Sequence, residues 1–138
     1  PELLTLLLLE LLIQIERQTG REHRKKDAYL HAEMEYAIQY FNEHYNSDIS
    51  IENYAASRGM SVSWFIRSFR QYVHTTPMQY LVERRMANAQ MLLETTSYNI
   101  AEISTLVGYD NPLYFSRIFK KQKGMSPTEY RKYSAADV

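Results

Sequence analysis

The feature that most constrains the fold is a sequence pattern that occurs twice, about fifty residues apart. In each copy a short apolar segment leads to a glycine, then to two phenylalanines four positions apart, then to a hydroxyl residue followed by proline. The first four matched pairs are 49 residues apart and the remaining pairs are 50 apart. The pairs are Ile51/Ile100, Tyr54/Ile103, Ala55/Ser104, Gly59/Gly108, Trp64/Tyr114, Phe65/Phe115, Arg67/Arg117, Phe69/Phe119, Arg70/Lys120, Thr76/Ser126, Pro77/Pro127 and Tyr80/Tyr130. Two related structural units are therefore predicted in tandem.

Each copy is typical of a helix-turn-helix motif. A small residue in the first helix lets the second helix cross it closely, and the glycine, Gly59 or Gly108, allows a left-handed turn between them. The phenylalanines then anchor the second helix in the core. We predict a first motif over about residues 50–73 and a second over about residues 99–123.

Helix start signals divide the rest of this region. The run Thr76-Pro77-Met78-Gln79 offers an N-cap, a proline at the first helical position and a capping-box glutamine, so it predicts a linker helix over residues 77–94. A second box, Ser126–Glu129, predicts a last short helix. No strand-like alternation extends beyond a few residues, and the chain is predicted to be all-α. Further N-caps are expected at Ser50, Ser61, Asn99 and Asn111.

A leucine-rich segment precedes the repeat. Residues 2–18 predict a helix that is apolar on nearly every side, followed by a basic linker at residues 19–27 and another helix from about residue 28 to 45. Such a helix is expected to bury its apolar side chains, and two readings are equally supported: a core helix of the same domain, or a homodimerisation helix through residues 3–15. At about 20 Å, residues 3–15 are shorter than the roughly 30 Å of a bilayer core, so no membrane partner is expected. The spacing that suggests a partner involves Leu4, Leu8, Leu11 and Ile15.

Charge is distributed unevenly along the chain, although the formal net charge is zero. Residues 1–48 contain five Lys/Arg and nine Asp/Glu, whereas residues 49–138 contain eleven and seven. The second part is thus the part whose charge suits a nucleic acid. The absence of cysteine excludes a disulfide framework and a cysteine-based zinc site, and it fits a reducing cytoplasm.

The second helix of each motif carries the candidate functional side chains. Opposite the core phenylalanines it offers hydroxyls, long apolar side chains and basic groups, which are the groups that read base edges and hold phosphates in a major groove. The alternative for the arginines is a surface arginine paired with a neighbouring acid. The exposed positions are predicted to be Ser63, Ile66, Arg67, Arg70, Pro112, Leu113, Ser116, Arg117 and Lys120. The aromatic residues Trp64, Phe65, Phe69, Tyr114, Phe115 and Phe119 are expected in the core instead.

Nothing in the sequence indicates an enzyme. The four histidines lack metal-ligand spacing, and there is no glycine-rich phosphate loop and no recognisable nucleophile motif. We therefore predict no catalytic residues, no metal and no cofactor. A helical protein-interaction bundle without DNA binding remains the alternative function; the zero net charge favours it, and the matched arginines of the two copies argue against it.

The second copy resembles the AraC/XylS family of transcription regulators. It contains I-A-x-I-x-x-x-V-G-Y at residues 100–109, Y-F-S-R-x-F-K-K at residues 114–121 and S-P-x-x-Y-R at residues 126–131. The linker helix matches the family spacing through Tyr80, Leu81, Arg85, Ala89, Leu92 and Leu93. The first copy departs from the family pattern at His74, where a glycine is usual, and at Trp64.

The resemblance implies two helix-turn-helix motifs on one rigid linker helix, with both second helices in successive major grooves of DNA. It assigns residues 28–134 to an AraC-type DNA-binding domain and residues 1–27 to the end of a sensor or dimerisation domain. It also implies a cytoplasmic, nucleoid-associated regulator that contacts RNA polymerase if it is an activator. The operator, the effector ligand and the direction of regulation are left open. The DNA-binding residues expected on this basis are Ser61, Ser63, Ile66, Arg67, Arg70, Asn111, Pro112, Leu113, Ser116, Arg117, Lys120 and Lys121.

Overall fold

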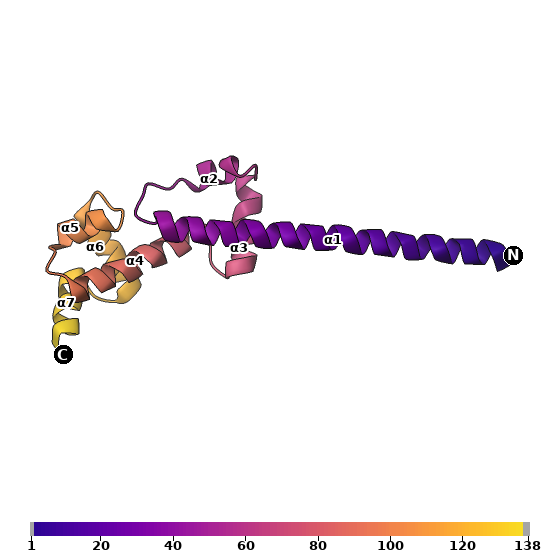
Figure 1. Ribbon diagram of the computed structural model, residues 1–138. Helices are drawn as coiled ribbons and strands as arrows, with labels where there is room; N and C mark the ends of the chain where they lie inside the picture. The colour runs from indigo at the N-terminus through magenta and orange to yellow at the C-terminus, as the bar shows by residue number, and fades with distance from the viewer. Residues whose placement is uncertain (1, 137–138) are drawn as a thin grey trace. The chain divides into compact units, whose positions relative to one another are not determined.

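The computed structural model describes residues 2–136, and within that range it contains helices and no strand (Figure 1). The all-α prediction is confirmed. In chain order the helices are α1 (Glu2–His44), α2 (Ile51–Ser57), α3 (Val62–Val73), α4 (Pro77–Thr95), α5 (Ile100–Leu106), α6 (Pro112–Lys123) and α7 (Pro127–Ala136).

Helix α1 corrects one prediction, because residues 19–27 are helical and form no linker. The segment contains no proline, and a single glycine, Gly20, costs a helix interior only about 1 kcal/mol. One contact four residues apart lies in this stretch: His23 Nε2 and Asp27 Oδ2 are 3.4 Å apart. The run that resembled a solvated connection is therefore a solvated helix.

The leucine-rich start of α1 is exposed. The chain divides after Ala37 into two compact parts, which are described separately. In the first part the large apolar side chains between Leu3 and Ile15 are 48–72% exposed. Within the described residues of the first part, which form a single stretch of helix, no other element covers these side chains, and both readings of the segment stay open. No helix within residues 2–136 has both the length and the apolarity to cross a membrane.

In the second part, each helix-turn-helix motif closes around its own core. In the first motif (α2 and α3) the ring of Phe41, from the end of α1, lies 6.3 Å from Phe65 and 5.8 Å from Phe69, measured between centroids. Tyr54 and Tyr80 complete this aromatic cluster. In the second motif (α5 and α6) the core contains Met86, Ala89, Leu93, Ile103, Val107, Tyr109, Phe115 and Phe119. The predicted burial of both phenylalanine pairs is confirmed.

The predicted capping residues begin the helices as expected. Thr76 and Gln79 form a complete capping box at α4, with proline at the first helical position. Ser126 and Glu129 exchange the corresponding bonds at α7. The side chains of Ser50, Ser61, Asn99 and Asn111 also accept backbone N–H bonds at the starts of their helices.

The repeat is longer than the sequence pattern suggested, because it includes the helix before each motif. Tyr80 donates its hydroxyl to Asn42 Oδ1 at 2.8 Å, and Tyr130, its counterpart, donates to Glu94. Asn42 and Glu94 are 52 residues apart, and the same offset relates Met34, Ala37 and Phe41 to Met86, Ala89 and Leu93, all of which are buried. Helix α4 thus closes the first motif and also supports the second.

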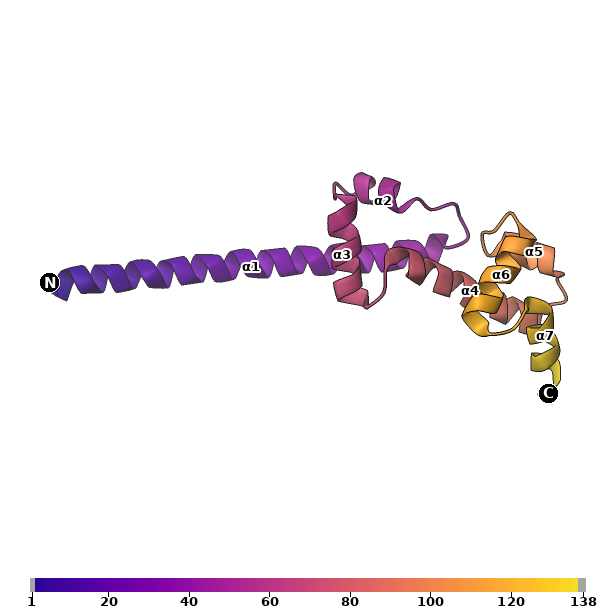
Figure 2. The same cartoon turned by 180° about the vertical axis from the view of Figure 1, so that it is seen from behind.

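Both motifs rest on this shared helix. α4 contacts α3, α5 and α7, and α6 contacts α7. Figures 1 and 2, seen from opposite sides, show α3 leading into the start of α4 and α5–α7 gathered towards its end. The two motifs are therefore joined by one element with no flexible segment inside it.

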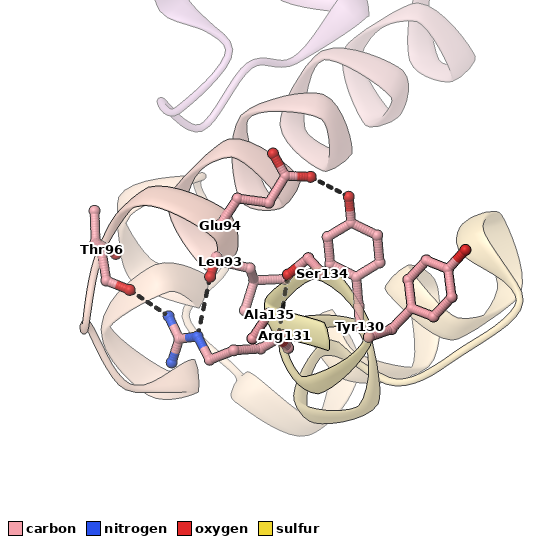
Figure 3. Close-up of a pocket in the computed structure, with 8 residues that line it drawn as sticks. Leu93, Glu94, Thr96, Tyr130, Arg131, Ser134 and Ala135 are labelled. Atoms are coloured by element: carbon pink, nitrogen blue, oxygen red, sulfur yellow. Dashed lines mark hydrogen bonds between the residues drawn. The ribbon is translucent and has the colours of Figure 1, made fainter. Parts of the chain in front are cut away.

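The end of α4 is secured by α7 (Figure 3). Arg131 donates from Nε to the Leu93 carbonyl oxygen at 3.2 Å and from Nη2 to the Thr96 carbonyl oxygen at 3.3 Å. These carbonyls lack intrahelical partners because the helix ends there. The hydrogen bond from Tyr130 to Glu94 raises the pKa of the Tyr130 phenol to about 12. An open groove of about 680 Å³ lies beside these contacts.

Candidate nucleic-acid interface

One face of α3 presents the outward-facing residues predicted for the first motif. Ser63, Ile66, Arg67 and Arg70 recur at the three- and four-residue spacing that places them on one side of the helix, and all four are exposed. Phe65 and the other core residues occupy the opposite side. The structure thus separates the anchoring and the outward-facing positions of α3 as predicted.

The equivalent face of α6 differs in chemistry. Leu113 is 70% exposed, near the start of the helix, and Arg117 and Lys120 follow it on the same side. Lys121 is exposed beside them, whereas Pro112 and Ser116 are half-buried. An exposed leucine beside basic groups suits a surface that contacts both the methyl group of thymine and phosphates.

Among the described residues, the basic groups of these two faces have no acidic partner. Within residues 2–136, the side chains of Arg67, Arg70, Arg117, Lys120 and Lys121 make no ion pair and no hydrogen bond. This observation removes the alternative of surface arginines held by neighbouring acids. Charges that stay unpaired in the free protein need not break an internal bond before they bind an anion.

Two of the predicted interface residues have a structural role in addition. The Ser61 Oγ accepts the Trp64 N–H at 3.1 Å, and the Asn111 Oδ1 accepts the N–H groups of Leu113 and Tyr114 at 3.0 and 3.3 Å. Both side chains are exposed at the helix start, and each retains a hydrogen-bond donor, a hydroxyl in serine and an amide in asparagine. They can cap their helices and still donate to a ligand.

The expected burial of one aromatic residue, Tyr114, was wrong. Tyr114 is 55% exposed, and its ring packs only edge-on against Tyr109, with centroids 5.9 Å apart. Its counterpart Trp64 is half-buried. Both residues precede a core phenylalanine, so they lie at the border between the core and the outward face. Tyr114 therefore joins the candidate interface, and its place directly after exposed Leu113 was the available signal.

No cluster of histidine and acidic side chains that could hold a metal occurs in the part of the chain that the structure describes. The groove beside α7 is lined by the residues that cap α4, including Arg131.

Comparisons with known proteins agree on one family. A family model described as a helix-turn-helix domain matches residues 54–133. The arabinose operon regulatory protein of Escherichia coli is 38% identical over 96 residues, which are 69% of this chain and 33% of that protein. The HTH-type transcriptional regulator AlkR of Acinetobacter baylyi is 36% identical over 107 residues, 78% of this chain and 35% of the relative.

Solved structures show the same fold. The DNA-binding domain of AdpA in complex with a target DNA superposes with a TM-score of 0.71 and 32% identity, covering 75% of this chain and 94% of that one. The C-terminal domain of AraT from Geobacillus stearothermophilus gives a TM-score of 0.70 and 35% identity, with 72% and 84% covered. The chain spans about a third of the length of the curated relatives it matches.

Proposed function

Because this chain belongs to the AraC/XylS family of helix-turn-helix transcription regulators, which are not enzymes, we propose that it binds specific double-stranded DNA sequences and regulates transcription. In this proposal α3 and α6 are the recognition helices. Each enters a major groove with its outward face, and the two grooves are successive turns of one side of the duplex.

The observation that carries the proposal is the pair of equivalent outward faces with unpaired arginines. Arg67 and Arg117 occupy matching positions of the two motifs, and both are exposed. Arginine is the side chain that most often reads guanine through two hydrogen bonds, and it also binds phosphates. The neighbouring Arg70, Lys120 and Lys121 are proposed to contact phosphates, which fix the register without reading sequence.

The length of α4 supports binding by both motifs together. Its 19 residues correspond to about 28 Å. Successive major-groove contacts on one face of DNA are about 34 Å apart. A helix of this length, with a motif packed at each end, is of the scale needed to reach both grooves.

The exposed leucine-rich segment is proposed to bind a second copy of the chain. Residues 3–15 present a contiguous apolar surface along α1, and surfaces of this kind mark association sites in proteins. Contact with RNA polymerase, if the protein is an activator, and a place at the bacterial nucleoid in the cytoplasm are proposed together with the regulatory role.

The test is selection of bound sequences from a random DNA pool, followed by titration of the selected sequence at several salt concentrations. We expect two short conserved segments about one DNA turn apart, and an affinity that falls steeply as salt increases. Binding with no sequence preference would contradict specific regulation. An absence of binding even at low salt would favour the alternative of a protein-interaction bundle.

A further inference from the structure

Arg85, on the linker helix α4, holds the segment that enters the first motif. Its Nε donates to the Tyr45 carbonyl oxygen at 2.7 Å, and its Nη2 donates to the Ser47 carbonyl oxygen at 2.8 Å. Both carbonyls lie in the loop between α1 and α2. One guanidinium thus fixes the path of the chain into the first helix-turn-helix motif.

The same guanidinium also contacts the turn of the second motif. The Arg85 Cζ lies 4.9 Å from the ring centroid of Tyr109, which is 7% exposed. A cation over an aromatic face attracts the ring electrostatically, and burial strengthens the attraction. Burial raises the pKa of the Tyr109 phenol, and Arg85 acts in the opposite direction.

Tyr109 is rigidly connected to the helices of its own motif. Its N–H donates to the Ser104 carbonyl oxygen at 2.9 Å, and the buried Ser104 Oγ donates back to the Tyr109 carbonyl oxygen at 2.9 Å. Its ring packs against Phe115 of α6, with centroids 5.9 Å apart. The position of Tyr109 is therefore coupled to the position of the recognition helix α6.

Gly108 shows how closely these elements approach one another. A Cβ atom at this position would lie 3.2 Å from the Asn46 Cα, from the Asn46 carbonyl carbon and from the Arg85 Nε, and the backbone φ is +101°. The turn of the second motif therefore packs against both the loop before the first motif and the Arg85 side chain. We define this meeting point as the junction: Arg85, residues 45–47 and residues 108–109.

We propose that Arg85 is a positioning residue that fixes the orientation of the two helix-turn-helix motifs relative to each other, and so determines the spacing of the DNA segments they read. The inference rests on the proposed function. Helix α4 is one connection between the two motifs, through its contacts with α3, α5 and α7. The junction adds a second connection beside α4, which further restricts rotation of one motif relative to the other.

The functional consequence concerns binding by two sites at once. A second contact gains a high effective concentration only when the geometry permits both contacts together. Fixing that geometry before binding lowers the ordering cost. Arg85 itself is half-buried and gives its donors to carbonyls, so its effect on DNA binding is indirect.

The first experiment separates positioning from direct contact. The full chain and its Arg85→Met variant are titrated against the selected DNA, against the same DNA with either contacted segment scrambled, and against spacings changed by one base pair. Arg84→Met is the matched control, because Arg84 is the adjacent, exposed arginine of the same helix. Two contacts together exceed one by about 10²–10⁴ in affinity.

We expect Arg85→Met to reduce the affinity gain from binding both segments together roughly tenfold. Its affinity for DNA with one segment scrambled should be unchanged, and its preference for one spacing should weaken. Arg84→Met should alter none of the three. Equal losses on full and half sites would overturn the inference in favour of a direct DNA contact, and an unchanged spacing preference would overturn it outright. Tyr109→Leu removes the contact between Arg85 and the Tyr109 ring and keeps the Arg85 hydrogen bonds to the Tyr45 and Ser47 carbonyl oxygens. It should also lower the affinity for the full site and flatten the spacing preference, and it serves as the test if Arg85→Met does not fold.

A second experiment needs no DNA. The chain contains no cysteine, so Ala56→Cys and Ala101→Cys, both exposed and on the first helices of the two motifs, allow spin labels at two defined positions. Arg85→Met should broaden the distribution of distances between the two spin labels, measured by pulsed electron paramagnetic resonance, whereas Arg84→Met should not. A distribution as narrow as that of the parent would overturn the inference. If Arg85→Met broadens the distance distribution but the parent chain binds no DNA, the proposed function is contradicted. The structural role of the junction is supported in that case.

Discussion

Arg67 and Arg117 occupy equivalent positions in α3 and α6, two residues after a buried phenylalanine that anchors each helix. The anchor determines which way the arginine faces, because positions two apart on a helix lie on different sides. The matching pair also differs in its neighbours: Ser63 and Ile66 flank the first arginine, whereas Leu113 and Ser116 flank the second. The two motifs are thus expected to read different bases with the same backbone.

Replacing Arg67 or Arg117 with alanine should cost about 1–3 kcal/mol of specific binding if the residue reads a base, and should relax sequence preference at one position. Fluorescence anisotropy on the selected site and its single-base variants measures both effects. Arg84→Ala, on the linker helix, is the control and should bind as the parent does. A uniform loss on every sequence with a shallower salt dependence would assign the residue to phosphate contact, and no loss in either variant would refute the interface.

At the scale of single elements, the ends of the helices explain why short segments are stable here. α2 and α5 have seven residues each, too few to be stable alone in water. Side-chain caps and the complete burial of Ala55 and Ser104 compensate for that shortness. The matched ends of α3 and α6 share a left-handed backbone conformation, with φ of +68° at His74 and +82° at Gly124. They differ in residue type, because only Gly124 lacks a Cβ atom.

This difference predicts opposite effects of two substitutions. A residue with a Cβ in the left-handed region costs roughly 1 kcal/mol or more relative to glycine. Exposed His74→Gly should therefore raise the free energy of unfolding by about 1 kcal/mol, and Gly124→Ala, whose added Cβ would meet no atom within 4 Å, should lower it by a similar amount. Urea denaturation measures both. A destabilised His74→Gly protein would show that the imidazole contributes more than its backbone strain removes.

The leucine-rich half of α1 gives a second prediction at this scale. If residues 3–15 bind a second copy, sedimentation velocity should show a dimer for the parent chain and a monomer for the double variant Leu8→Gln, Leu11→Gln. Glu10→Gln, a change at the polar residue between these two leucines, is the control and should remain dimeric. A monomeric parent whose thermal stability is unchanged by removal of residues 1–20 would contradict the proposed role.

At the scale of the whole molecule, the two motifs share α4, and within residues 38–136 no linker of flexible composition separates them. The first motif ends where α4 begins, and the second rests on the other end of the same helix. Binding should therefore depend on the phase of the DNA helix between the two contacted segments as well as on their sequence.

Inserting about five base pairs between the contacted segments places them on opposite faces of the duplex. Affinity should then fall to that of one motif. Inserting a full turn restores the face but adds about 34 Å, beyond the reach of a helix of about 28 Å, so it should not restore binding. Anisotropy titration of the three spacings decides the matter, and equal affinity for all three would mean that only one motif reads DNA.

Most local features could be predicted from the sequence because their causes are local. A capping box, a glycine in a turn and a pair of phenylalanines four apart act within a few residues, so the helix starts and the core positions of α3 and α6 followed from the chain itself. The linker at residues 19–27 was wrong because a charged run suits a solvated helix as well as a solvated loop, and only the cooperativity of α1 distinguishes them.

The sequence by itself determined the all-α fold, the tandem repeat and the outward faces of its second helices, because periodicity and capping record which side of a helix is apolar. Only the tertiary structure decided what Arg85 and Tyr114 do. The family spacing marks Arg85 in the sequence but shows none of its contacts, since its partners Tyr45, Ser47 and Tyr109 are 24–40 residues away and two of them act through backbone carbonyls that any residue could supply. The exposure of Tyr114 depends on how far the neighbouring core extends, which is a property of packing in three dimensions.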